Sequence, residues 1–341
     1  MVVNLLLRIS RSNQRFSLLW GSGGGAGRGL STLAYEVVET TAPSSAPSAA
    51  TASTAFILHG LMGSGRNWRT FSRQLASSLV SPSSAWKIVL VDLRNHGKSV
   101  GIQGLEPPHD MANSARDLAN LINAHKWASP DVVIGHSMGG KVALEFLASC
   151  ARGDYGESVV LPKQLWVLDS VPHEVNSDNN DLEVEKVLHT LQSLSTPLPS
   201  RRWLVEHMIK QGFSKALSEW VGSNLKVDST GKQMTWAFNL SGCVEMFDSF
   251  LQKDYWPLLE KPPKGTDIMI VRAERSDRWT PEVIQKLESL TSKGAEEASK
   301  GRVLYHVLPD AGHWVHVDNP KGLLDIMIPH MKSLSHSDPS R

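Results

Sequence analysis

The residue best suited to covalent chemistry in this sequence is the serine of a G-x-S-x-G motif. The segment Gly135-His136-Ser137-Met138-Gly139 follows the apolar run 132–134 (VVI) and precedes the helix-like run 141–148 (KVALEFLA). At a tight strand-to-helix turn a serine has a strained backbone that lifts its hydroxyl out of the sheet, and glycines beside it prevent clashes. The N-terminus of the following helix favours a developing anion. Ser137 is therefore the predicted nucleophile.

Acyl transfer to a serine also requires fixed hydrogen-bond donors for the oxyanion of a tetrahedral intermediate. The backbone N–H after the nucleophile, that of Met138, is one candidate. The second is expected from a loop after an earlier strand, and the glycine-rich segment 59–65 (HGLMGSG) has that place, with the Leu61 N–H as the candidate donor. Met62, Met138 and Trp314, with tryptophans from the middle of the chain, are predicted to line an apolar acyl pocket.

Four motifs carry a resemblance to a known family. HGLMGSGRNW (59–68), DLRNHGKS (92–99), GHSMGG (135–140) and AGHWVHVDNP (311–320) occur in the order found in the alpha/beta-hydrolase superfamily. More narrowly, the chain is similar to the group of alpha/beta-hydrolase domain-containing protein 11 and related small bacterial esterases, from about Ala55 to a C-terminal helix near Met331. The resemblance implies a serine hydrolase that acts on acyl esters or thioesters with no cofactor and no metal. The motif 92–99 is expected to be architectural.

A histidine after the last strand is the expected general base. His313 fits this place, because it follows the apolar run 303–308 and because Gly312 permits a tight turn. His316 is a rival, but no glycine precedes it.

The acidic partner of the histidine stays open between two aspartates. The usual place in the superfamily is the loop after the strand 267–271, which gives Asp277 in RAERSDRWTP (272–281). That loop has Ala273 where glycine is typical, and one apparent extra residue. Related small esterases have the acid at the end of the preceding strand, which gives Asp169. Either carboxylate could accept the N–H of His313, and the other would be a turn or helix-cap residue.

The segments that must hold these residues alternate between strand-like and helix-like patterns. Nearly continuous apolar runs suit parallel strands covered on both faces, and the helix-like segment 112–126 lies between two of them. This alternation predicts a doubly wound, mostly parallel α/β sheet, the alpha/beta-hydrolase fold. The long stretch 172–266 has no convincing strand and is interpreted as an inserted helical cap. The predicted strands are 55–58, 87–93, 131–134, 164–168, 267–271 and 303–308.

Composition excludes several classes of protein. With 41% hydrophobic and 20% charged residues, disorder as the main state is excluded. The net charge of +1 argues against a nucleic-acid partner, and no apolar run reaches the 18 residues of a membrane span. Cys150 and Cys243 match neither a disulfide framework nor a zinc site. A small acyl substrate is the expected partner, and the sequence does not indicate an oligomeric state.

The N-terminal segment 1–34 is interpreted as a disordered transit peptide that precedes a hydrolase domain over 35–341. It contains four arginines and no acidic residue, which is typical of an organelle-targeting segment. We expect a mitochondrial location, with the chloroplast as the alternative. A secretory signal and a plain disordered tail are the weaker alternatives.

Two other functions remain open on the same fold. His313 and Asp318 form an H-x₄-D string seen in some superfamily members assigned acyl transfer, although Asp318 also fits a turn that opens the next helix. The second alternative is a ligand receptor without enzymatic activity. A dehalogenase is disfavoured, because that chemistry needs an aspartate in place of Ser137.

Overall fold

A computed structural model of the 341-residue chain describes residues 16–21, 32–40, 52–81, 85–175, 182–293 and 301–334. At its centre is an eight-stranded sheet with the order β1-β2-β4-β3-β5-β6-β9-β10. The strands from β4 to β10 pair in parallel, whereas β2 pairs antiparallel with both β1 and β4. The strands are β1 (Phe16–Gly21), β2 (Tyr35–Thr40), β3 (Ser53–Leu58), β4 (Trp86–Val91), β5 (Val132–His136), β6 (Gln164–Leu168), β9 (Asp267–Ala273) and β10 (Arg302–Leu308).

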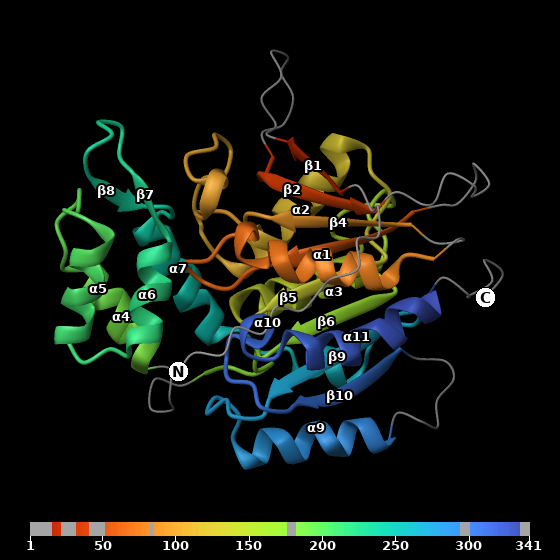
Figure 1. The fold of residues 1–341 in the computed structure, drawn as a ribbon. Helices are drawn as coiled ribbons and strands as arrows, with labels where there is room; N and C mark the ends of the chain where they lie inside the picture. The colour runs from red at the N-terminus through yellow and green to blue at the C-terminus, as the bar shows by residue number, and fades with distance from the viewer. Residues whose placement is uncertain are drawn as a thin grey trace, which may run out of the picture.

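Each of the six apolar runs predicted as strands forms a strand of this sheet, so the mostly parallel α/β prediction is confirmed. Alternate side chains of β3 enter two separate cores: Phe56 and Leu58 pack on one face, and Ile57 packs on the other. Helices α2 and α3 cover the first face, and α1 and α11 cover the second (Figure 1). Their bounds are α1 (Arg69–Leu79), α2 (Met111–His125), α3 (Met138–Arg152) and α11 (Pro320–Leu334), with α9 (Pro281–Lys293) and the short α10 (Val315–Asp318) in addition.

The segment between β6 and β9, where the sequence predicts a cap, is mainly helical. Helices α4 to α6 and a small hairpin lie beside the sheet, on the side of the site described below (Figure 1). The hairpin was not expected, because strands of three residues are too short to show an alternating pattern. The elements are α4 (Leu182–Gln192), α5 (Arg201–Lys210), α6 (Lys215–Ser223), β7 (Leu225–Val227), β8 (Met234–Trp236), α7 (Leu240–Gln252) and α8 (Trp256–Glu260).

A fully buried lysine fastens this inserted segment to α3. The Lys141 ammonium donates to the backbone carbonyls of Phe250 (2.6 Å), His173 (2.7 Å) and Lys253 (2.9 Å). An ammonium carries three N–H donors, so three carbonyls satisfy it completely. Helix α3 begins directly after Ser137, and the end of α7 is thereby held at a fixed distance from the predicted nucleophile.

Only part of the predicted transit peptide, residues 1–34, lies within the residues that the structure describes. Residues 1–15 and 22–31 of the predicted transit peptide lie outside the described residues. Strand β1 falls inside that segment and pairs with β2, and Leu33 and Ala34 are buried. These parts therefore differ from the disorder expected for residues 1–34, and the targeting role stays a prediction.

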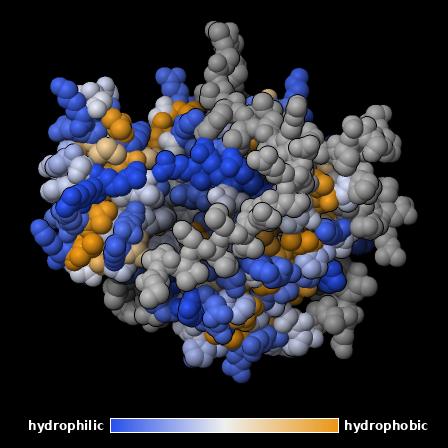
Figure 2. Space-filling model, viewed as in Figure 1, coloured by the Kyte–Doolittle hydropathy of each residue, from blue (hydrophilic) through white to orange (hydrophobic). Residues whose placement is uncertain are grey.

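On the face shown in Figure 2, hydrophobic side chains of the described residues are interspersed with hydrophilic ones, which is usual for a globular surface. Within the described ranges, no helix combines the length and the hydropathy that a membrane crossing requires.

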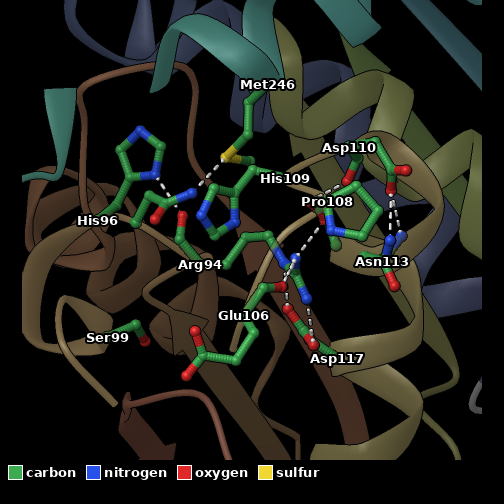
Figure 3. Close-up of polar contacts among 12 residues, drawn as sticks. Arg94, His96, Ser99, Glu106, Pro108, His109, Asp110, Asn113, Asp117 and Met246 are labelled. Atoms are coloured by element: carbon green, nitrogen blue, oxygen red, sulfur yellow. Dashed lines mark hydrogen bonds and ion pairs between the residues drawn. The ribbon is translucent and has the colours of Figure 1, made fainter. Parts of the chain in front are cut away.

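A buried ion pair holds the loop that follows β4. The Arg94 guanidinium makes two hydrogen bonds to the Asp117 carboxylate of α2, at 2.7 and 3.0 Å, and donates to the carbonyl of Pro108 at 2.8 Å (Figure 3). Both charged side chains are at most 5% exposed. Removing one member of such a pair leaves an uncompensated charge in the interior. The motif 92–99 is thus fixed to α2 and to the segment before it.

We therefore expect Asp117→Ala to lower the free energy of unfolding by about 3–5 kcal/mol, because the Arg94 charge would stay buried without its carboxylate. Urea denaturation followed by circular dichroism measures this loss. Glu206→Gln, which removes one partner of the exposed Arg202–Glu206 pair on α5, is the control and should leave the midpoint unchanged. Equal midpoints for Asp117→Ala and the wild type would contradict the structural role of the buried pair.

Candidate active site

Ser137 occupies the turn between β5 and α3 in a strained backbone conformation. Its φ of 53° and ψ of −123° are rare for a residue with a side chain. The turn needs glycine on both sides: a Cβ at Gly135 would lie 2.1 Å from the Gly139 carbonyl oxygen, and one at Gly139 would lie 2.6 Å from that of Leu58. The Ser137 amide donates to the Leu168 carbonyl at 3.0 Å, which ties the turn to β6. The serine is therefore held where the sequence predicted a nucleophile.

His313 lies on the loop after β10 and contacts a buried carboxylate. Its Nδ1 is 2.8 Å from Oδ2 of Asp169, whose side chain is 0% exposed. The adjacent His136 donates through Nε2 to the His313 carbonyl at 2.7 Å, and the two rings lie 4.7 Å apart. A carboxylate on Nδ1 fixes the tautomer of the imidazole and leaves Nε2 as the nitrogen that can take a proton.

Asp169 is surrounded by hydrogen-bond donors. Besides His313, it accepts from the Trp279 indole N–H (2.7 Å), the Ser276 hydroxyl (2.9 Å) and the Ala273 amide (3.1 Å). Burial alone would raise the pKa of the Asp169 carboxyl, but the hydrogen bonds from His313, Trp279 and Ala273 outweigh burial and hold the pKa below its usual range. The carboxylate is therefore ionised at neutral pH.

The structure brings one of the two candidate acids to His313 and not the other. Asp169 directly follows β6, with a φ of 44°, and faces the histidine, whereas Asp277 is exposed on the loop after β9. The same loop sends Ser276, directly before Asp277, and Trp279, two residues after it, onto the Asp169 carboxylate. No sequence pattern pointed to this use of Ser276 and Trp279 as donors.

The loop 59–65, called the oxyanion loop below, lies against the nucleophile: a Cβ at Gly60 would be 3.2 Å from Cβ of Ser137. The Gly60 carbonyl accepts from Nδ1–H of His59 at 2.8 Å and from the Gly63 amide at 3.1 Å. In a trans peptide the N–H points opposite to the C=O, so these two bonds also orient the Leu61 N–H.

The second predicted donor is the first amide of α3. The Met138 N–H has no intrahelical acceptor, because the first four amides of any α-helix have none. Leu61 and Met138 both line the cavity that contains Ser137.

His59 itself is fully buried, and its Nε2 accepts from the Leu93 amide at 3.0 Å. Burial lowers the pKa of His59 to about 4, despite the opposing hydrogen bond to Gly60. The imidazole is thus neutral under physiological conditions and serves as a fixed support of the loop.

A cavity of about 370 Å³ joins the predicted residues. Ser137, His313, Met62 and Trp314 line it, together with the two predicted oxyanion donors. One wall of the cavity comes from the segment between β6 and β9 and is largely apolar. A few polar groups also line the cavity, and this composition is typical of ligand pockets. The apolar wall residues are Val184, Val187, Leu217, Trp220, Phe247 and Phe250, and the polar ones include Asn67, Glu183, Arg278 and Asp318.

The two alternative residues of the last motif have other contacts. His316 stacks on Trp68 with 3.9 Å between ring centroids, and burial together with the nearby His313 lowers its pKa to about 4. Asp318 accepts from the Gly312 amide at 2.8 Å, and so supports the turn that carries His313. Among the residues that the structure describes, no group of three or more His, Cys, Asp or Glu side chains is arranged to bind a metal.

The fold and this arrangement define an alpha/beta hydrolase. The model of the alpha/beta hydrolase family matches residues 55–326, and the chain belongs to that family. Among curated proteins it is similar to the mouse sn-1-specific diacylglycerol lipase ABHD11, with 25% identity over 79% of this chain and 77% of the relative. A shorter match, 36% identical over 25% of this chain and 21% of the relative, is to ethanol acetyltransferase 1 of Kluyveromyces marxianus. Among solved structures, a marine microorganism esterase superposes with a TM-score of 0.66 at 21% identity, over 87% of this chain and 98% of that one.

The sign of the Asp169 pKa shift predicts how its contribution to stability depends on pH. A carboxyl with a lowered pKa stabilises the fold above its unfolded pKa of about 3.9, and that stabilisation is lost as the pH falls through the lower pKa of the folded state. We expect Asp169→Asn to cost about 1–3 kcal/mol at pH 7 and progressively less below about pH 4. Denaturation curves across pH measure this difference. The control is Asp277→Asn at an exposed position, which should change the free energy of unfolding at pH 7 by no more than about 0.5 kcal/mol. An Asp169→Asn deficit independent of pH would refute the shift.

Proposed function

We propose that the chain is a serine hydrolase that cleaves acyl esters or thioesters through a Ser137–His313–Asp169 triad and an acyl-enzyme intermediate. The observation that carries this proposal is the 2.8 Å contact of His313 with the buried Asp169, in a cavity that also contains Ser137 on its strained turn. Membership of the alpha/beta hydrolase family and the esterase and lipase relatives support a hydrolase activity.

In the proposed reaction, the Ser137 hydroxyl attacks the acyl carbonyl while Nε2 of His313 takes the hydroxyl proton. Asp169 stabilises the resulting imidazolium, and the amides of Leu61 and Met138 receive the oxyanion. Collapse of the tetrahedral intermediate expels the alcohol or thiol, which the imidazolium protonates. A water molecule, deprotonated by the same imidazole, then attacks the acyl-serine and releases the carboxylic acid and the free serine. The acyl chain would occupy the apolar wall of the cavity.

Ser137→Ala should abolish labelling by a fluorophosphonate probe and lower kcat by at least about 10⁴-fold, because no other hydroxyl replaces the nucleophile. Gel fluorescence and turnover of a p-nitrophenyl ester measure the two effects. Ser214→Ala removes another serine that lines the same cavity, and it should label like the wild type. Labelling that survives Ser137→Ala would contradict the assignment of the nucleophile. A wild type that is labelled by the probe but hydrolyses only one equivalent of ester would favour a ligand receptor.

The two aspartates can be separated by kinetics. We expect Asp169→Asn to reduce kcat by about 10²–10⁴-fold, because an amide cannot fix the His313 tautomer or stabilise its charged form. Asp277→Asn should keep kcat within about twofold of the wild type, as is usual for an exposed substitution. The reverse pattern, with Asp277→Asn as the inactive variant, would place the acid on the loop after β9.

Acyl transfer is the second candidate, and its support is the partial similarity to an ethanol acetyltransferase. The H-x₄-D aspartate favours it less, because Asp318 already binds the Gly312 amide. We expect the free acid to dominate the products of acyl p-nitrophenyl esters and acyl thioesters, even with an alcohol in excess. Chromatography of the products measures the partition, and a larger yield of the new ester than of the acid would favour a transferase.

A further inference from the structure

Two adjacent residues of the motif 92–99 lie between the oxyanion loop and the cap helix α7. Asn95 and His96 follow β4, both are at most 7% exposed, and neither enters the proposed chemistry. Figure 3 shows His96 on the loop that Arg94 anchors, below the helix that carries Met246. This loop is therefore in contact with the site on one side and with α7 on the other.

On the side of the site, His96 holds the peptide that follows Leu61. Its Nδ1–H donates to the Arg94 carbonyl at 2.7 Å, and its Nε2 accepts from the Met62 amide at 2.9 Å. Burial and the neighbouring His59 lower the pKa of His96 to about 3, so the acceptor lone pair is available at neutral pH. Met62 has a φ of 59°, a conformation that a residue with a side chain maintains only when its surroundings hold it.

On the side of the cap, the same loop is the docking point of α7. The Asn95 carbonyl accepts from the Asn239 amide at 2.7 Å, and Sγ of Cys243 lies 3.3 Å from Nε2 of His96. Gly242 packs so closely that a Cβ there would lie 2.4 Å from the Asn95 side chain. A larger residue at this position requires the buried Asn95 side chain or α7 to shift.

We propose that His96 is a positioning residue that couples the docking of α7 to the geometry of the oxyanion loop, an inference that rests on the proposed hydrolase function. One imidazole contacts the Met62 amide and Cys243 at the same nitrogen, so a shift of α7 against Asn95-His96 moves the acceptor that holds the Leu61–Met62 peptide. The donors for the oxyanion are then in place only while the apolar wall formed by α7 is also in place.

The first test is independent of catalysis. Gly242→Ala inserts a methyl group between α7 and Asn95 without removing any polar group, and alanine suits a helix. Hydrogen–deuterium exchange of the peptide covering 59–65 should become faster by about tenfold in this variant and in His96→Phe, as expected for a lost hydrogen bond. Asp248→Ala, on the exposed side of α7, is the matched control and should leave this peptide unchanged. Wild-type exchange in Gly242→Ala would overturn the coupling, whatever the activity.

The second test separates positioning from a general loss of structure. His96→Phe should lower kcat about tenfold or more with KM within about twofold, and it should weaken inhibition by a trifluoromethyl ketone, which forms an oxyanion on the serine, by a similar factor. His96→Gln, whose amide oxygen can accept from the Met62 N–H, should recover most of both. Adding Gly242→Ala to His96→Phe should cause no further loss, because both act through one contact. The inference would be overturned if the losses of kcat in the two single variants multiplied in the double variant, or if inhibition of His96→Phe were unchanged. A wild type without Ser137-dependent labelling would instead refute the proposed function.

Discussion

The site depends on one buried carboxylate that is kept ionised. Asp169 receives four donors, from His313, Trp279, Ser276 and the Ala273 amide, and it lies at the end of a central strand with no exposed surface. In such surroundings an unpaired carboxylate would take up a proton. Because the donors come from the end of β9, the loop after it and the loop after β10, the charge also binds the ends of three neighbouring strands together. Orientation of His313 and cohesion of the sheet edge thus have the same physical origin.

On the oxyanion-loop side of the cavity, the supporting side chains are uncharged. His59 and His96 are buried next to each other, with 5.0 Å between ring centroids, and both are neutral. Each imidazole donates through Nδ1 to a carbonyl and accepts an amide N–H at Nε2. Protonation at Nε2 would place an N–H against another N–H, so the environment permits one tautomer only. A rigid oxyanion loop follows, since backbone groups are held by side chains that cannot change charge near neutral pH.

The sequence was sufficient for the parts of the molecule that obey local rules. Six strands of the sheet showed as apolar runs, and the glycines around Ser137 reflect contacts that no larger residue allows. The acid could not be chosen from sequence, because Asp169 and Asp277 both follow a strand and only the tertiary path of the loop decides which one meets His313. Trp279 as a donor and Asn95-His96 as the contact with α7 were equally hidden, since neither partner is near in sequence. Strand β1 was missed because its segment was interpreted by composition, and the hairpin β7–β8 because it is short.

Lys141 has a consequence for the way small molecules reach the cavity. The residue is fully buried, and its ammonium donates to three carbonyls at the end of α7 and on the segment after β6. If α7 moved away from α3, the buried Lys141 ammonium would lose these hydrogen-bond acceptors, which costs much free energy. We therefore expect small molecules to enter and leave the cavity without a movement of the end of α7 that Lys141 binds.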